Sequence, residues 1–241
     1  MQLPDISSNR AVRDLIRRAL AEDIGTGDVT SLALVPPSAK ISAVILARRD
    51  YIVSGAEVAK AVFRAVDRRL ECAILAGDGQ RVRRGRAALR IRGSARSILT
   101  AERTALNFLQ RMSGIATLTG VFVERARRQG VMILDTRKTT PTLRILEKYA
   151  VLCGGGRNHR IGLFDRFLIK DNHRRLWRQG RAARLGEAVL QARKRFPGLP
   201  VEVEVENEAE LRSAMEARPE WILLDNMTPA RLRRCVKICA G

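Results

Sequence analysis

Apolar residues recur first at helical spacing and then at the spacing of strands. The positions from Val12 to Leu20 share one face of a helix predicted over residues 9–22, which the glycines beside Thr26 would end. Strands are expected at 40–47, 51–54, 70–75 and 88–91, with a helix from Gly55 to about residue 66. We interpret this stretch as a supporting α+β region, with a solvated acidic turn at 22–28 and no catalytic constellation.

A long helical zone follows. Residues 97–109 carry apolar side chains at helical period, Ser113 and Gly114 are expected to interrupt the helix, and residues 115–129 resume the period. Arg103 lies in the first of these helices, where spacing alone favours a solvated surface arginine.

After Gly130 the pattern alternates between strands and helices. Repeated strand–helix units with continuous apolar strands favour a parallel sheet arranged as a barrel, and the domain boundary is expected near Thr100. The predicted strands are 131–134, 167–169, 201–205 and 221–224, and the predicted helices are 143–151, 186–196, 208–217 and 229–238.

Every predicted strand of this second region ends in polar residues. The carboxyl ends of parallel strands meet at one edge, where α/β folds bind their ligands, so we expect these side chains to line one site. They are Asp135, Arg137, Lys138, Lys170, Asp171, Asn172, Glu202, Glu204, Glu206, Asp225 and Asn226.

The alternation of glutamate and valine at 201–206 puts Glu202, Glu204 and Glu206 on one face of a strand. Inward-facing carboxylates are costly unless they are paired, and the lysines and arginines of neighbouring strands are the expected partners. A pocket of cations with a few carboxylates suits a ligand that carries carboxylates and phosphates, with the acidic residues holding Mg²⁺ or sugar hydroxyls. The residues alone therefore predict an α/β enzyme that acts on a polyanion.

His159 stands in a short segment that follows the glycines at 154–156. The glycines predict a loop that can approach a ligand closely. The chain has only 2 histidines, and both lie within residues 131–173. A role in ligand binding and an ordinary surface or core position are equally favoured for His159.

Composition limits the class of protein. The 241 residues are 46% hydrophobic, which indicates a globular chain of one large or two small domains, and no apolar run approaches the roughly 20 residues of a membrane span. The first ten residues are polar, so no signal peptide is expected; the scattered cysteines indicate no disulfide framework or zinc site, and cytoplasmic residence is the default.

The net charge of +20 admits a nucleic acid, an anionic membrane surface or a polyanionic small ligand as the partner. Aromatic residues are only 4%, and no basic strand is rich in them, so we expect no nucleic-acid partner and assign most of the excess charge to an arginine-rich surface.

At these residues the sequence resembles the quinolinate phosphoribosyltransferase (carboxylating nicotinate-nucleotide pyrophosphorylase) family. The resemblance runs in order over nearly the whole chain. It comprises EDIGTGDVT (22–30), ERTALN (102–107), LDTRKTTP (134–141), GGGRNHR (154–160), IKDNH (169–173), EVEVE (202–206) and LDNM (224–227).

The resemblance implies a fold and an activity. The fold would be an N-terminal α/β sandwich domain over residues 1–100 and an open, incomplete α/β barrel with parallel strands over 101–241. The reaction would take quinolinate and phosphoribosyl pyrophosphate, with Mg²⁺, to nicotinate mononucleotide, pyrophosphate and carbon dioxide. The assembly would be a homodimer, or a multiple of it, with composite active sites.

The resemblance also implies roles for single residues. Arg137, His159 and Arg160, with Lys138 and Lys170, would hold the carboxylates of quinolinate, and Arg103 would enter from the partner subunit. Glu204 and Asp225 would hold the ribose hydroxyls of the donor and its Mg²⁺. The expected catalytic residues are Lys138, Lys170, Glu204 and Asp225.

One departure from the family keeps other readings open. The family continues beyond the Asp225-Asn226 pair with further barrel strands and phosphate-binding turns, and residues 174–184 are expected to form an unusually basic loop. The alternatives are an inactive or ligand-binding relative of the family, a homologue from the molybdenum-transport-associated family that shares DTRKTTP, and a nucleic-acid or anionic-surface binder. Turnover separates the first alternative from an active enzyme, and salt dependence identifies the last.

Overall fold

A computed structural model describes residues 3–177 and 185–240. The contacts between residues divide the chain into two compact units, residues 1–159 and 160–241, and each is described by itself. The domain division predicted after residue 100 falls inside a helix of the first unit and stays a prediction.

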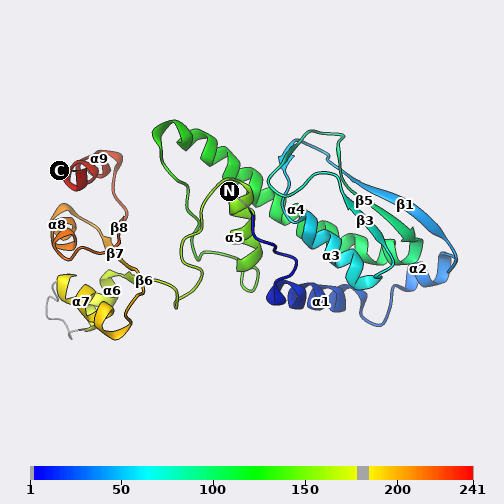
Figure 1. Ribbon diagram of the computed structural model, residues 1–241, viewed down its shortest axis with the longest axis horizontal. Helices are drawn as coiled ribbons and strands as arrows, with labels where there is room; N and C mark the ends of the chain where they lie inside the picture. Colours follow the sequence, from blue (N-terminus) through cyan, green and yellow to red (C-terminus); the bar gives the residue numbers. More distant parts are fainter. Residues whose placement is uncertain (1–2, 178–184, 241) are drawn as a thin grey trace. The chain divides into compact units, whose positions relative to one another are not determined.

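The first unit places a small antiparallel sheet on a layer of helices (Figure 1). Its sheet has the strand order β1-β5-β3, and its core consists of side chains from α1, α3, α4, α5 and the inner face of the sheet. The elements are α1 (Arg10–Ile24), α2 (Val29–Leu34), β1 (Lys40–Leu46), β2 (Tyr51–Ile52), α3 (Ala56–Val66), β3 (Glu71–Ile74), β4 (Arg81–Val82), β5 (Ala87–Ser94), α4 (Ala95–Ala126), the 3-10 turn η1 (Arg127–Gln129) and α5 (Arg144–Cys153).

The predicted helix near the chain start is confirmed as α1, and the acidic turn after it begins a second helix. Asn9 caps α1, whose buried residues are Val12, Ile16 and Leu20. Asp28 accepts hydrogen bonds from the Ser31 amide at 3.0 Å and the Thr100 hydroxyl at 3.1 Å, which lower the pKa of its carboxyl. Helix α2 was not predicted, because its six residues are too few to show a helical period.

The predicted interruption of the long helix is wrong, because α4 runs through Ser113 and Gly114 without a break. The Ser113 hydroxyl accepts from the Ser54 amide at 3.0 Å and donates to the Ser54 carbonyl at 3.2 Å, both in the core. This packing outweighs the cost of about 1 kcal/mol for a helical glycine. The 32 residues of α4 extend about 48 Å at 1.5 Å per residue.

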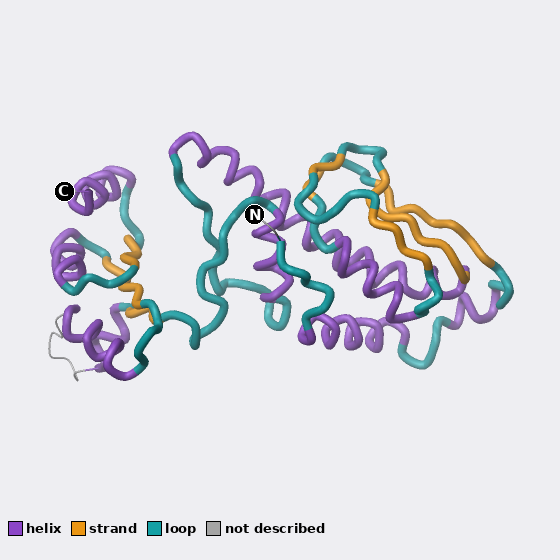
Figure 2. Tube along the Cα trace, viewed as in Figure 1, coloured by secondary structure: helices purple, strands orange, loops and turns teal. Residues whose placement is uncertain are grey.

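The strand predicted at 131–134 is also wrong. Residues 130–143 are loop (Figure 2). Within the described part of the chain, their one β-bridge is the parallel bridge between Leu134 and Arg157. The Arg157 amide donates to the Ile133 carbonyl at 2.8 Å, and Arg157 accepts from the Asp135 amide at 3.1 Å. A single residue of contact with Arg157 is too little to form a ladder, so the segment is extended without being a strand.

The second unit contains a parallel sheet of strand order β6-β7-β8. Its strands coincide with the three predicted at 167–169, 201–205 and 221–224, and one face of the sheet is packed against α7, α8 and α9 (Figure 1). The elements are β6 (Phe167–Ile169), α6 (Asp171–Trp177), α7 (Leu185–Arg195), β7 (Val201–Val205), α8 (Glu208–Glu216), β8 (Trp221–Leu224) and α9 (Pro229–Ala240).

Of the basic loop expected at 174–184, residues 174–177 belong to α6, and residues 178–184 lie outside the described part of the chain. Among the described residues, no helix combines the length and the hydropathy that crossing a membrane requires.

Candidate functional site

The predicted site residues fall into two groups, one in each compact unit. Arg103, Arg137, Lys138 and His159 belong to the first unit, and Arg160, Lys170, Glu204 and Asp225 belong to the second.

Three members of the second group, Lys170, Glu204 and Asp225, lie on the face of the parallel sheet opposite α7, α8 and α9. The register pairs Ile169 with Val203 and Val205 with Leu224, and these side chains pack with the helices. The alternate residues therefore point to the other face. These are Leu168, Lys170, Glu202, Glu204, Trp221 and Leu223.

Both glutamates on this face are paired with cations, as the alternation predicted. The Lys170 ammonium lies 3.0 Å from a Glu204 carboxylate oxygen, with 40% of the lysine side chain and 10% of the glutamate side chain exposed. Arg166 lies 3.6 Å from Glu202 and stacks over the Trp221 ring, 4.3 Å from its centroid. Arg166 was not predicted as a site residue. It alternates with Leu168 and Lys170 along the chain, so the two-residue period of a strand puts it on the same face.

Asp225 extends the face by one step beyond β8. Its amide donates to the Val205 carbonyl at 2.9 Å, which continues the parallel ladder, and alternation from Leu223 puts its side chain on the same face as Glu204. Asn226 turns the chain with φ +49° and donates its side-chain amide to the Asp225 carboxylate at 2.9 Å. The Asp225 carboxylate is thereby held at the carboxyl end of the sheet.

Two further contacts order the ends of β6. The Lys170 amide donates to Nδ1 of His173 at 3.0 Å, so this nitrogen is an acceptor and the ring proton lies on Nε2. Arg160 donates from its guanidinium to the Arg166 carbonyl at 3.4 Å. Asp165 accepts from the amides of Ile161 and Gly162, each at 2.8 Å, and so closes the turn that follows Arg160.

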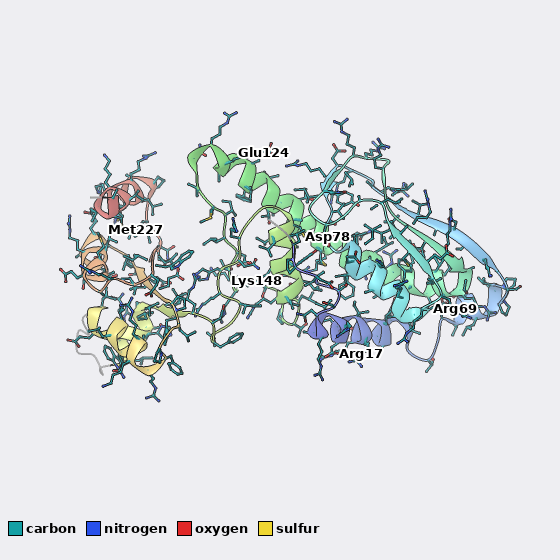
Figure 3. The ribbon with its side chains drawn as sticks, in the orientation of Figure 1. Arg17, Arg69, Asp78, Glu124, Lys148 and Met227 are labelled. Carbon is teal, nitrogen blue, oxygen red and sulfur yellow. The ribbon has the colours of Figure 1, made fainter. Side chains whose placement is uncertain are left out.

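The first group centres on a buried carboxylate, Asp135, whose side chain is 7% exposed. Lys148 belongs to α5, and its side chain is only 2% exposed (Figure 3). Its ammonium forms an ion pair with Asp135 and donates to the His159 carbonyl at 3.1 Å. The His159 amide donates to the same Asp135 oxygen at 2.8 Å. Lys148 was not predicted as a site residue. It could have been found as a lysine at a buried position of the helix predicted over residues 143–151.

The loop that carries Arg137 and Lys138 is attached to the start of α5. Arg144 donates to the Thr139 hydroxyl at 3.0 Å and to the Arg137 carbonyl at 3.4 Å, and Glu147 accepts from the Thr140 amide at 3.2 Å. Burial raises the pKa of the Glu147 carboxyl, but hydrogen bonds from Arg111 and Thr140 outweigh it, and the pKa is lowered. Arg137 is half-buried and Lys138 is exposed.

The glycines at 154–156 lie against other parts of the chain, and their predicted approach to a ligand stays a prediction. A Cβ on Gly154 would collide with the Ala116 carbonyl of α4, and one on Gly156 would lie 2.7 Å from Val151 and 3.2 Å from the Ile133 carbonyl. Their close approach is therefore to the protein's own backbone, and it brings the 157–159 segment beside residues 133–135. Arg103 is exposed on α4, next to the buried Thr104.

Among residues 3–177 and 185–240, no three histidine, cysteine or acidic side chains gather as a metal site. Two carboxylates, Glu204 and Asp225, share a face, and Glu204 is already paired with Lys170. This donor set resembles the one or two carboxylates that accompany a Mg²⁺ held by substrate phosphates, rather than a protein-built metal cage.

Known families match nearly the whole chain. The family described as the N-terminal domain of quinolinate phosphoribosyl transferase matches residues 28–113, and the family described as its C-terminal domain matches residues 115–240. The chloroplastic nicotinate-nucleotide pyrophosphorylase [carboxylating] of Arabidopsis thaliana is 43% identical over 225 residues, 90% of this chain. A probable nicotinate-nucleotide pyrophosphorylase [carboxylating] of Bacillus subtilis is 38% identical over 228 residues, covering 94% of this chain and 77% of the relative.

The fold is similar to solved structures as well. The nicotinate-nucleotide pyrophosphorylase of Francisella tularensis superimposes with a TM-score of 0.89 at 38% identity, over 100% of this chain and 84% of that one. The chain spans 63% of the length of the Arabidopsis thaliana relative and 59% of the corresponding Oryza sativa protein.

Proposed function

Since the chain belongs to the quinolinate phosphoribosyltransferase family, we propose that it transfers the phosphoribosyl group of phosphoribosyl pyrophosphate to quinolinate. The products are nicotinate mononucleotide, pyrophosphate and carbon dioxide, and the activity is that of a decarboxylating pentosyltransferase. Relatives named quinolinate phosphoribosyltransferase [decarboxylating] support the reaction type.

The observation that carries the proposal is the ion pair between Lys170 and Glu204 on the sheet face opposite α7, α8 and α9. An anionic substrate can displace the carboxylate from the half-exposed lysine, which then neutralises the substrate's charge. The released Glu204, with Asp225, can accept hydrogen bonds from ribose hydroxyls. Preorganised charges of this kind stabilise charge that develops in a transition state without further reorganisation.

The remaining cations of the candidate set fit the dicarboxylate. Arg137 and Arg160 offer planar guanidinium forks to carboxylates, and Lys138 offers an exposed point charge. His159 completes this set, and Arg103 of a second subunit would complete each site in a homodimer. The exposure of Arg103 on α4 supports that part of the proposal.

The chemistry needs little beyond this charge arrangement. Pyrophosphate leaves C1 of the ribose as positive charge develops on the ring, and the pyridine nitrogen forms the new bond to C1. The quaternised ring then accepts the electron pair of the carbon–carboxylate bond as carbon dioxide leaves, and a proton takes its place. Mg²⁺ would arrive with the donor, contacted by Glu204 or Asp225, and would supply charge neutralisation of its phosphates.

Cytoplasmic residence belongs to the same proposal. The free state of Cys72, Cys153, Cys235 and Cys239 supports a reducing compartment. The names of the plant relatives place those proteins in chloroplasts or mitochondria.

The decisive experiment is turnover by the 241-residue chain with quinolinate, phosphoribosyl pyrophosphate and Mg²⁺. We expect nicotinate mononucleotide by chromatography and an equal amount of carbon dioxide from carboxyl-labelled quinolinate. Lys170→Met is the matched control and should lower kcat by roughly 10²–10³. A folded protein, verified by circular dichroism, that forms no product would overturn the proposal and favour an inactive or ligand-binding relative.

A second candidate function, binding of a nucleic-acid strand, is favoured by a groove of about 1030 Å³ between α1 and α3. Its carboxylates are engaged, Asp14 with Arg17 and Glu57 with Lys60. In the described part of the chain, the other arginines of the groove have no carboxylate within ion-pair distance. They are Arg10, Arg13, Arg64 and Arg68.

This candidate departs from the expectation of no nucleic-acid partner, and salt tests it. A fluorescent single-stranded oligonucleotide should bind in low salt and lose affinity as salt rises, because bound phosphates release counterions. The variant Arg13→Glu/Arg64→Glu should lose most of that binding and keep its turnover. Binding that the variant leaves unchanged would exclude the groove.

A further inference from the structure

The buried ion pair between Lys148 and Asp135 contacts the backbone of His159, one of the candidate substrate-binding residues of the first unit. Their side chains are 2% and 7% exposed, so neither group has room to bind a substrate directly. A buried pair of this kind is seldom a source of net stability, because desolvation offsets the attraction, and a role in fixing a particular geometry is a better explanation.

Both members of the ion pair also form hydrogen bonds with one short segment of chain, residues 158–159. Lys148 donates to the His159 carbonyl at 3.1 Å, and the Asp135 oxygen that it contacts accepts from the His159 amide at 2.8 Å. The amide orientation of Asn158 that satisfies its neighbours puts its nitrogen 2.7 Å from the second Asp135 oxygen and 3.0 Å from the Lys148 carbonyl. Both backbone polar groups of His159 are therefore held by the pair.

The same face of α5 also holds the loop of Arg137. Arg144, one turn before Lys148, donates to the Arg137 carbonyl at 3.4 Å and to the Thr139 hydroxyl at 3.0 Å. Residues four apart on a helix are neighbours on its surface. Arg144 therefore attaches the Arg137 segment to α5, and Lys148 attaches the His159 segment to the same helix. Helix α5 thus fixes the spacing between these two residues, both of which are candidates for binding quinolinate.

We propose that Lys148 is a positioning residue, which through Asp135 holds the His159 segment against the Arg137 loop in the arrangement that binds the dicarboxylate substrate. The inference rests on the proposed function for the identity of that substrate. The geometric part, that Lys148 and Asp135 fix the His159 backbone, is independent of it.

The kinetic test compares two substrates. Lys148→Met should raise KM for quinolinate by about tenfold or more, since misplacement of a binding group by about 1 Å can cost a factor of 10². KM for phosphoribosyl pyrophosphate should change less than about twofold, because the residues proposed to hold it, Glu204 and Asp225, belong to the other unit. An equal rise in both constants, or no rise, would overturn the positioning role.

Tyr149→Phe is the matched control. Tyr149 is the next residue of the same helix, is also buried, and donates its hydroxyl to Asp78 at 2.8 Å instead of to a member of the pair. If loss of any buried polar contact of α5 impaired the site, this variant would raise KM for quinolinate as well. We expect KM unchanged within about twofold.

Two double variants keep the test valid if Lys148→Met does not fold. Asp135→Asn/Lys148→Met and Asp135→Ala/Lys148→Met both remove the buried charges, but only the asparagine keeps an acceptor for the His159 amide. The asparagine variant should retain KM for quinolinate within about threefold, and the alanine variant should raise it by about tenfold or more. Equal KM values in the two double variants would contradict the proposal.

A second readout does not depend on activity. With only 2 histidines in the chain, histidine-selective ¹⁵N labelling gives two backbone amide signals, and His173 serves as the internal reference. The His159 amide should exchange slowly in the native protein and at least about tenfold faster in the alanine double variant. If the native protein lacks turnover but shows this difference, the proposed function fails and the geometric role stands; unchanged exchange overturns the role itself.

Discussion

The two groups of candidate residues show opposite ways of placing a cation beside a carboxylate. In the second unit, Lys170 and Glu204 stand on neighbouring strands, where sheet register alone brings them to 3.0 Å on a half-exposed face. In the first unit, Lys148 and Asp135 come from a helix and a loop and are buried together. A strand pair can remain open to ligands, whereas a loop needs an internal pair to have a defined shape.

The difference in exposure between the two ion pairs indicates which of them a ligand can reach. Lys170 is the more exposed member of its pair, with 40% of its side chain open to solvent, so an anionic ligand could compete with Glu204 for it. The buried pair cannot open without leaving an uncompensated charge. We therefore propose substrate contact for the strand pair, and support of neighbouring residues for the loop pair.

The largest expected effect is a difference in stability: replacing lysine by methionine should destabilise the protein more in the buried ion pair than in the strand pair. Lys148→Met should destabilise the first unit by about 3–5 kcal/mol, because it leaves Asp135 buried without its partner. Lys170→Met should cost less, about 1–3 kcal/mol, because Lys170 itself is half-exposed, although Glu204, 10% exposed, loses its cation. Denaturant titration measures both.

The probes must be chosen by unit. The chain's 2 tryptophans, Trp177 and Trp221, lie in the second unit, so their fluorescence follows Lys170→Met, while far-ultraviolet circular dichroism follows Lys148→Met. Equal losses of stability would show that burial does not separate the two pairs.

A smaller loss of stability is expected from substitution of the glycines that pack beside the loop of residues 133–135. Gly154→Ala should cost about 1–3 kcal/mol, because its Cβ would meet the rigid Ala116 carbonyl. Gly114→Ala in the middle of α4, where a Cβ meets nothing within 4 Å, should instead stabilise the protein by about 0.5–1 kcal/mol. Thermal unfolding of both variants tests the pair, and destabilisation by Gly114→Ala would contradict the unbroken helix.

Low pH should lower the free energy of unfolding of the first unit, because Glu147 holds the loop of residues 137–140. The pKa of this carboxyl is lowered in the folded state, so its contribution to stability is complete above its ordinary value near 4.5 and is lost as the pH falls through the lower folded value. We expect the free energy of unfolding to decline below about pH 4.5 and to decline less steeply in Glu147→Gln. Parallel slopes for the two proteins would remove Glu147 as a cause.

The smallest effect should come from a surface pair within α6, which sets the lower end of the series. Arg175, with 78% of its side chain exposed, lies 3.2 Å from Asp171. Arg175→Ala should change stability by less than about 0.5 kcal/mol, since solvent and salt screen such pairs. Tryptophan fluorescence in denaturant measures it, and a loss as large as that of Lys170→Met would undo the ranking by exposure.

The contrast between the two halves also explains what the sequence could predict. Period-two alternation located β7 and put Glu202 and Glu204 on one face with cationic partners, because strand geometry depends only on local pattern. The break proposed at Ser113 and Gly114 failed because a distant partner, Ser54, decided the outcome. The apolar run at 131–134 resembled a strand, but among the described residues its one bridge is to Arg157, which follows the glycines at 154–156.

Lys148 shows the limit for the site. A lysine among buried helical positions was visible in the sequence, yet its partner Asp135 stands thirteen residues earlier in a loop without periodicity. No local rule connects the two residues, and only the tertiary contact gives the lysine its meaning. Roles inferred from the family named the residues expected to touch substrate and were silent about the one that supports them.

The unbroken course of α4 governs how this protein can be taken apart and recombined. The two matched family domains meet at residues 113–115, in the middle of that helix, so a recombinant fragment that begins or ends there would cut it and expose the buried positions at Met112 and Ala116. Chimeras with relatives are therefore better joined outside residues 95–126. A crossover inside them would have to match every contact of the helix at once.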